Sequence, residues 1–123
     1  MPLQVSTESP STIAHSLKSS SSTSSFLVVY ASEIDGRSWC GDCREAEPLV
    51  DAKFVDRAEV VKVVFAGQKD EWRKADNPWR QAPFSVTNLP TLIKVTGKEW
   101  ERLVEEDVYD QKKLDAFVGP KRS

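Results

Sequence analysis

Both cysteines of the chain, Cys40 and Cys43, stand in one six-residue stretch, SWCGDC at positions 38 to 43. Two thiols separated by two residues are compatible with three kinds of chemistry: a redox-active dithiol, half of a metal site, or a structural disulfide. In the first two the reactive species is the thiolate, which attacks disulfides and ligates metals. The choice among the three depends on the residues and elements that surround the pair.

A metal site has little support in the sequence. A zinc ion takes four protein ligands, or three and a water molecule. Cys40 and Cys43 supply two, and the single histidine, His15, lies in a separate segment of the chain. A site completed by carboxylates stays open as an alternative, but we expect no metal.

A purely structural disulfide is disfavoured by the expected compartment. No apolar run approaches the roughly 20 residues that span a bilayer. Residues 1–25 also lack the shape of a signal peptide, which has a charged start followed by an unbroken apolar stretch. We therefore expect a cytoplasmic protein without membrane association, and cytosolic thiols are kept reduced.

The composition predicts one globular domain over residues 1–123. The chain is 39% hydrophobic and 29% charged, and it is long enough to bury a core. Its 17 basic and 19 acidic residues are scattered along the sequence, which argues against nucleic-acid binding because that needs a clustered basic excess. The serine-rich segment 19–25 has nothing to bury and is predicted to be a mobile loop, with a phosphorylation target as the less common explanation.

Apolar patterning predicts an α/β domain, a sheet covered by helices on both faces. Runs rich in β-branched residues predict strands at 26–31, 59–66, 90–95 and 100–105, with a short edge strand in 1–6. Helical spacing predicts helices after Pro10, over 41–57 and after Asp110. Residues 68–88 are predicted to be a long polar connection. The SWCGDC motif therefore follows a buried strand and a loop, and it opens an amphipathic helix.

This position suits a redox dithiol. At the start of a helix, Cys40 lies near unpaired backbone N–H groups that stabilise its thiolate. Cys43 follows one helical turn later and lies beneath it. We therefore predict that Cys40 is the nucleophile and that Cys43 resolves the mixed disulfide that Cys40 forms with a substrate.

The surroundings of the motif resemble the thioredoxin fold, with a central mixed sheet and the dithiol at the start of the second helix. The frame W-C-x-x-C at 39–43 is followed by Pro48 within the helix and by L-P-T at 89–91, where a strand opens. The resemblance implies that Pro90 is a cis proline facing the dithiol. It also implies that the Leu89 backbone pairs with an extended substrate and that Trp39 forms a flat lip of the cleft.

A closer resemblance is to the Clot-type thioredoxin-like family, the thioredoxin domain-containing protein 17-like proteins. The stretch SWCGDCREAEP resembles the family signature S-W-C-P-D-C-x-x-A-E-P, and the likeness extends over residues 26 to 107. It includes Gly67, Trp72, Asn77 and Arg80, and the stretches LPTLIKV and RLVEE.

This resemblance implies a thiol–disulfide oxidoreductase without a bound cofactor, and we expect a monomer. It also implies that the electrons come from NADPH through a thioredoxin reductase. The substrates that it implies are small disulfides such as cystine, nitrosylated thiols and selected protein disulfides.

The dipeptide Gly41-Asp42 tunes the redox potential, and Gly41 replaces the family's proline. Asp42 keeps a backbone N–H that can donate to the Cys40 sulfur, while its carboxylate opposes a nearby thiolate. The sequence leaves open which effect prevails. Thioredoxins also bury an acid in the strand before the dithiol, where it accepts the proton of the resolving cysteine. This chain has Val28 at that position. Asp42 and Glu47 are the candidate acids for removing the proton of Cys43, although such carboxylates more often only decorate a helix start.

The aromatic residues of the long connection have two possible roles. Trp72 and Trp79 either anchor the connection to the core, the commoner case, or wall the dithiol cleft together with Arg80 and narrow substrate choice. Two other functions also stay open for the chain. One is a regulatory module that holds partner proteins through the same cleft and rarely turns over. The other is a reductase that uses glutathione.

Overall fold

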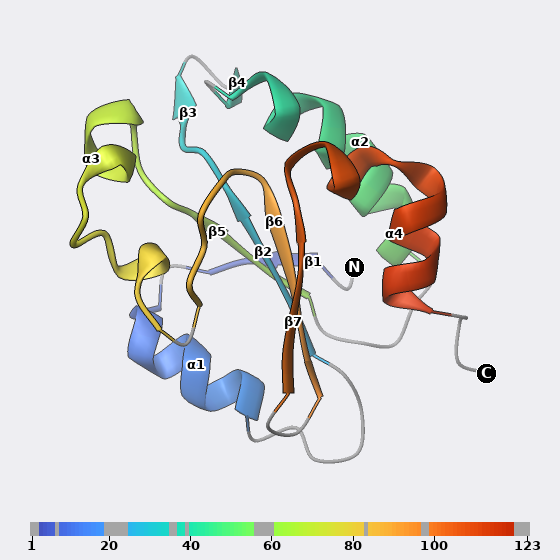
Figure 1. Ribbon diagram of the computed structural model, residues 1–123, viewed down its shortest axis with the longest axis horizontal. Helices are drawn as coiled ribbons and strands as arrows, with labels where there is room; N and C mark the ends of the chain where they lie inside the picture. Colours follow the sequence, from blue (N-terminus) through green and yellow to red (C-terminus); the bar gives the residue numbers. More distant parts are fainter. Residues whose placement is uncertain are drawn as a thin grey trace.

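The computed structural model describes residues 3–6, 8–18, 25–34, 37, 38, 40–55, 61–82, 84–96 and 99–119. A five-stranded mixed sheet lies at its centre, with strand order β1-β5-β2-β6-β7 (Figure 1). Its strands are β1 (Leu3–Val5), β2 (Ser25–Tyr30), β5 (Val61–Phe65), β6 (Thr91–Thr96) and β7 (Glu99–Val104). β1 and β2 run parallel to β5, whereas β6 is antiparallel to β2 and β7. The predicted α/β architecture is confirmed.

Helices cover both faces of this sheet, as predicted. Figure 1 shows α1 (Pro10–Lys18) and α3 (Lys69–Arg73) on one side, and α2 (Gly41–Phe54) and α4 (Gln111–Val118) on the other. Because both faces are covered, the central strand β2 is buried along its whole length, which explains its unbroken apolar sequence. No helix in the described ranges has the length and apolar character needed to cross a membrane.

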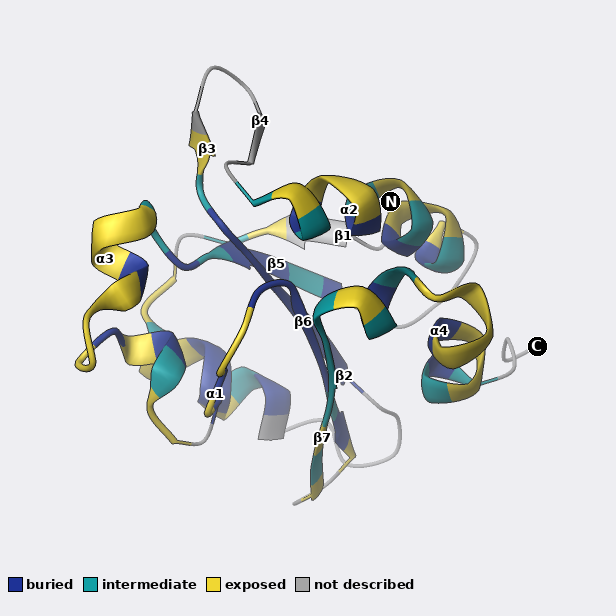
Figure 2. Ribbon diagram, turned by 45° about the horizontal axis from the view of Figure 1, so that its top comes forward, coloured by how far each residue is buried: buried dark blue, intermediate teal, exposed yellow. Residues whose placement is uncertain are grey.

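The core is concentrated in the central strands and in the helix faces turned toward them (Figure 2). Between β2 and α2, the rings of Phe26 and Phe54 lie 4.9 Å apart between centroids. On the opposite face, α1 contributes Ile13 and Leu17, both buried. This packing fixes α2 on the sheet, and α2 carries the dithiol at its first turn.

Several short elements were not predicted. The loop before the dithiol contains a hairpin of β3 (Glu33–Ile34) and β4 (Arg37–Ser38). The connection 68–88 contains α3 and the 3₁₀ helix η1 (Pro78–Arg80), and a second 3₁₀ helix, η2 (Glu105–Tyr109), precedes α4. Elements of two to five residues bury too few side chains to leave a periodic apolar pattern.

The boundary of the predicted serine-rich loop needs one correction. Ser25 is the first residue of β2, where it is buried and pairs with Val95 of β6. A strand residue that pairs within the sheet cannot belong to the loop. The rest of the predicted loop, residues 19–24, lies outside the described residues.

Candidate active site

Cys40 and Cys43 occupy the start of α2, as the sequence predicted. Cys40 is the N-cap of the helix, with extended backbone angles (φ −91°, ψ 119°). Its sulfur accepts a hydrogen bond from the backbone N–H of Cys43 at 3.2 Å. An N-cap side chain normally satisfies one of the free N–H groups of the first turn. Here a sulfur does so, and a thiolate is a better acceptor than a thiol.

The two sulfurs differ in exposure. Cys40 is half-buried, whereas Cys43 is fully buried. Behind Cys43, the backbone N–H of Ala31 at the end of β2 donates to its sulfur at 3.4 Å. A substrate can therefore reach Cys40 first, and Cys43 can attack only from within the protein. Both cysteines are in the thiol form in this structure.

The surroundings of Cys40 lower its pKa from 9.0 to about 7. The largest cause is a hydrogen bond from the Cys43 side chain, and the N–H groups of Cys43 and Asp42 act in the same direction. Partial burial and the charge of the Asp42 carboxylate oppose them. Cys40 consequently carries an appreciable thiolate fraction near neutral pH, the form that attacks disulfides.

Asp42 shifts the pKa of Cys40 in both of the expected directions, and the two shifts are unequal. The repulsion of its carboxylate raises the pKa of Cys40 more than the donation from its N–H lowers it. The carboxylate is held by Tyr109 of η2, whose hydroxyl donates to Oδ1 at 2.9 Å and whose pKa rises to about 12 through this bond. Tyr109 was not predicted, because no local sequence pattern relates two residues 67 positions apart.

The segment opposite the dithiol has the predicted form. The Leu89–Pro90 peptide bond is cis, as predicted, and Pro90 is buried. Its part in a substrate cleft stays a prediction. The Cys40 thiol lies 3.6 Å from the Leu89 carbonyl oxygen and donates to it. The backbone N–H of Glu105 fixes the turn from the other side by donating to the Pro90 carbonyl at 2.8 Å. Pairing of Leu89 with a substrate stays a prediction.

The predictions for two further residues of the motif, Gly41 and Trp39, stay open. Gly41 is exposed and is the first residue of α2, and a Cβ added there would meet the Arg44 side chain at 3.7 Å, an ordinary contact. Its influence on the redox potential stays a prediction. Trp39, predicted as the lip of the cleft, lies outside the described residues.

The aromatic residues of the connection are anchors. Trp72 and Trp79 are both buried. The Arg80 guanidinium lies 4.3 Å above the Trp72 ring and its Nε donates to the Trp72 carbonyl at 2.7 Å. The Trp79 ring packs edge-on against Phe84, with centroids 4.8 Å apart. The anchoring prediction is confirmed, and the proposed role in substrate choice stays a prediction.

Asn77 organises this connection, a role that was not predicted. It is buried, and its side-chain amide donates to the carbonyls of Ala66 and Glu71 at 2.8 and 3.1 Å. Its carbonyl oxygen accepts from the Trp79 N–H at 3.0 Å. One side chain thus ties the end of β5 to α3 and η1. The Asn77-Pro78 dipeptide, which marks a turn, is the sequence signal that could have found it.

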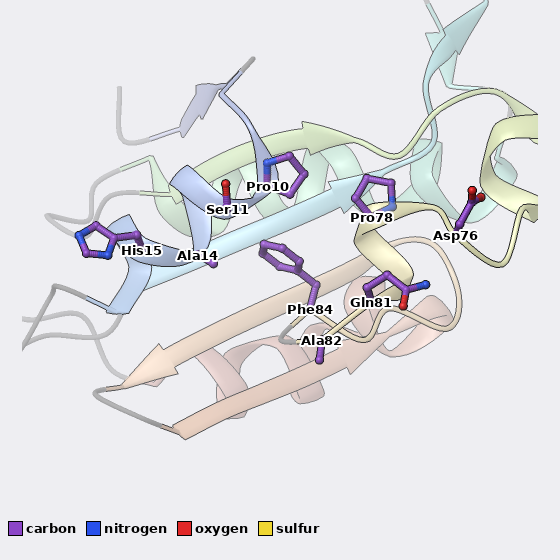
Figure 3. Close-up of a pocket in the computed structure, with 9 residues that line it drawn as sticks. All are labelled: Pro10, Ser11, Ala14, His15, Asp76, Pro78, Gln81, Ala82 and Phe84. Atoms are coloured by element: carbon purple, nitrogen blue, oxygen red, sulfur yellow. The ribbon is translucent and has the colours of Figure 1, made fainter.

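A groove of about 530 Å³ lies between α1 and the segment 76–84, with Phe84 on one wall. Figure 3 shows His15 and Asp76 at its opposite ends. None of its lining residues belongs to α2 or to the Leu89–Pro90 turn, so we assign it no part in thiol chemistry. In the described part of the chain, no group of three or more His, Cys, Asp or Glu side chains is arranged to hold a metal ion.

Sequence comparisons relate the chain to known thioredoxin-like proteins. Residues 6–120 match the family model "Thioredoxin domain-containing protein 17-like, thioredoxin domain". The thioredoxin-like protein Clot of Arabidopsis thaliana is 32% identical over 108 residues, which cover 79% of this chain and 81% of that protein. Thioredoxin domain-containing protein 17 of Mus musculus is 36% identical over 77 residues, 61% of this chain and 60% of that protein.

Structural comparisons confirm the thioredoxin fold. Fasciola hepatica thioredoxin superposes with a TM-score of 0.64 at 20% identity, over 94% of this chain and 95% of that chain. A thioredoxin from Nicotiana alata gives a TM-score of 0.58 at 26% identity, over 99% and 94% of the two chains. In this chain the fold consists of the mixed sheet, the flanking helices and the dithiol at the start of α2.

Proposed function

Because this chain belongs to the thioredoxin domain-containing protein 17-like family, we propose that it reduces small-molecule disulfides and selected protein disulfides through Cys40 and Cys43. A thioredoxin-like domain with this cysteine pair supports oxidoreductase activity in general. One observation carries the proposal of disulfide reduction. A half-buried Cys40 with a pKa of about 7 caps the helix that holds the buried Cys43. This pairing provides one thiol for attack and one for resolution.

The reaction is thiol–disulfide exchange in two steps. The Cys40 thiolate attacks one sulfur of the substrate disulfide, whose S–S bond breaks, and the first substrate thiolate leaves with the electron pair. Cys43 then loses its proton and attacks the Cys40 sulfur. A Cys40–Cys43 disulfide forms, the bond between Cys40 and the substrate breaks, and the second thiolate leaves. Two electrons pass from the protein dithiol to the substrate.

The turn opposite the dithiol is the proposed binding surface for the substrate. In the reduced protein the Cys40 thiol donates to the Leu89 carbonyl. When Cys40 reacts, this carbonyl loses its donor and becomes available to a backbone N–H of an extended substrate. Pro90 is the proposed wall of this cleft.

The proposed electron source is NADPH, delivered by a thioredoxin reductase in the cytoplasm, without a metal or an organic cofactor bound to this chain. The family membership supports this part of the proposal. Low-molecular-weight disulfides such as cystine and nitrosylated thiols are the proposed small substrates. The protein acts on them as a monomer.

The test couples the purified protein to thioredoxin reductase and NADPH, with cystine as substrate. We expect NADPH oxidation that depends on the protein and on cystine, and that is lost in Cys40→Ser. Reduction by glutathione but not by thioredoxin reductase would identify a glutathione-dependent enzyme. Stable capture of disulfide-containing proteins without turnover would identify a regulatory module. Either result would contradict the proposed reductase.

A further inference from the structure

Cys43 has to lose its proton before it can resolve the mixed disulfide, since only the thiolate is an effective nucleophile. In the reduced protein the Cys43 side chain donates a hydrogen bond to the Cys40 sulfur. That acceptor is consumed once Cys40 is bonded to the substrate. Cys43 is fully buried, so bulk water does not take its place. The second step therefore needs another proton acceptor inside the protein.

The strand beneath α2 shows where such an acceptor can act. Phe26 faces α2, because its ring packs on Phe54 with centroids 4.9 Å apart. Side chains alternate along a strand, so Val28 and Tyr30 face α2 as well. Val28 offers no polar atom. Tyr30 lies at the end of β2, next to Ala31, whose N–H donates to the Cys43 sulfur.

The Tyr30 hydroxyl is buried without a hydrogen-bond partner among the described residues. Only 3% of the residue is exposed, and its oxygen belongs to the few buried side-chain atoms that the described structure leaves unpaired. An unpaired buried hydroxyl is unfavourable and calls for an explanation, such as a role in proton transfer or an ordered water molecule. This hydroxyl is therefore available to bridge the groups around it.

Those groups form one stripe of α2. Cys43, Glu47 and Asp51 are spaced at four-residue intervals, which places them on the same side of the helix. Burial raises the pKa of Tyr30 far above its ordinary value, and the charges of Asp51, Glu47 and Cys43 add to the effect. The phenol thus stays protonated and lies within the electrostatic reach of all three side chains.

Glu47 is the better placed of the two carboxylates. It follows Cys43 by one turn, whereas Asp51 follows by two. Burial raises the pKa of Glu47, and the charges of Glu33 and Asp51 raise it further, which makes its carboxylate a stronger base. The other nearby acid, Asp42, accepts a hydrogen bond from Tyr109 instead.

We propose that Glu47 accepts the proton of Cys43 during resolution, with Tyr30 as the positioning residue that bridges the thiol and the carboxylate. This inference rests on the proposed disulfide reduction and names a further residue for it. The proton leaves the Cys43 sulfur, the Tyr30 hydroxyl takes it and releases its own proton to Glu47. The Cys43 thiolate forms the bond to Cys40, and the substrate thiolate leaves with the electron pair. Glu47 afterwards returns its proton to solvent.

The experiment separates the two chemical steps by rapid mixing of the reduced protein with 5,5′-dithiobis(2-nitrobenzoate). Attack by Cys40 releases a first coloured thiolate, and resolution by Cys43 releases a second. The variants are Glu47→Gln and Tyr30→Phe. Glu45→Gln is the matched control, since it removes the same charge from the same helix on the side of Tyr109. Tyr30→Phe keeps the ring and removes only the unpaired hydroxyl, so we expect it to fold normally.

We expect the first phase to be the same in all four proteins. The second phase should slow by about 100-fold or more in Glu47→Gln and Tyr30→Phe, in keeping with the usual size of general-base effects, and stay unchanged in Glu45→Gln. The pH profile of the second phase is a further test, because a purely structural role of Glu47 would leave this profile unchanged. Glu47 accepts a proton only as a carboxylate, so the wild-type second phase should fall as the pH drops through the raised pKa of Glu47. Glu47→Gln should lose this step.

Three results would overturn the inference. A Glu47→Gln variant with the wild-type second phase and pH profile would exclude Glu47 as the acceptor. A normal second phase in Tyr30→Phe would exclude the bridging role. If the wild-type protein released no thiolate in the first phase, the proposed function itself would fail, and this inference with it.

Discussion

The Tyr109 hydroxyl donates a hydrogen bond of 2.9 Å to the Asp42 carboxylate, joining residues 67 positions apart in the sequence. The bond attaches η2 to the first turn of α2, beside the thiol of Cys40. It therefore fixes a negative charge next to the sulfur that has to ionise. The reactivity of Cys40 depends on this opposing charge as well as on the hydrogen bonds that favour its thiolate.

Replacing Asp42 by asparagine should lower the pKa of Cys40 below its value of about 7. The substitution removes the carboxylate repulsion and keeps the backbone N–H that donates to the sulfur. Thiolate absorbance in the ultraviolet, followed against pH, measures the change. Glu45→Gln removes a charge from the same turn and should shift the pKa less, since Glu45 acts on Tyr109. A raised Cys40 pKa in Asp42→Asn would contradict this account.

Replacing Cys43 by alanine should raise the pKa of Cys40 toward its ordinary value. The Cys43 side chain supplies the largest favourable hydrogen bond to the Cys40 thiolate, and alanine cannot donate. The rate of alkylation by iodoacetamide, which increases with pH as the thiolate forms, reports this pKa. Cys43→Ser retains a donor and should produce a smaller rise. Equal pKa values in the wild-type protein and the alanine variant would show that the backbone alone stabilises the thiolate.

The buried strands and the dithiol helix could be predicted because their sequences carry local patterns. β2 is an apolar run of β-branched and aromatic residues, and burial on both faces of the sheet requires such a run. Cys40 and Cys43 were identifiable from their spacing before an amphipathic helix. The cis form of Pro90 followed from resemblance to a known fold, and no local pattern would have revealed it.

The remaining features depend on contacts between distant segments. α3 buries a single side chain, Trp72, so its five residues show no helical periodicity. The pairing of Tyr109 with Asp42 and the packing of Tyr30 beneath α2 both arise from how the helices sit on the sheet. From the sequence, Asp42 and Glu47 were equally plausible acceptors for the proton of Cys43. The structure distinguishes them, because Asp42 contacts Tyr109 and Glu47 lies on the stripe above Tyr30.

Replacing Gly41 by proline should stabilise the protein. Gly41 is the first residue of α2, a position where proline is favoured because its fixed φ suits the helix and its missing N–H has no acceptor within the helix. A proline compatible with the native backbone adds about 0.4–1 kcal/mol to the free energy of unfolding, since it restricts the unfolded chain. Urea denaturation measures this free energy. A decrease would mean that the backbone at position 41 does not accept proline.

Replacing Gly67 by alanine should destabilise the protein by about 1–3 kcal/mol, the usual cost of a side chain in a forbidden backbone region. Gly67 has φ +113°, and an added Cβ would lie 2.8 Å from the Cβ of Glu71. Its backbone also exchanges two hydrogen bonds with Ser32, which lies in the loop before the dithiol.

Gly119→Ala is the control for this substitution. Gly119 has φ +83°, and nothing lies within 4 Å of its added Cβ. We expect a smaller loss of unfolding free energy than at Gly67, again by urea denaturation. Equal losses at the two sites would show that the contact with Glu71 relaxes at no cost.

The most direct test of the central claim, that Cys40 attacks and Cys43 resolves, is mass spectrometry of two single-cysteine variants after exposure to cystine. Cys43→Ser should accumulate a mixed disulfide in which one half-cystine is bound to Cys40, because no thiol remains to release it. Cys40→Ser should show no adduct, since its remaining thiol is fully buried. An adduct on Cys43 in Cys40→Ser, or cystine reduction that survives this substitution, would contradict the assignment.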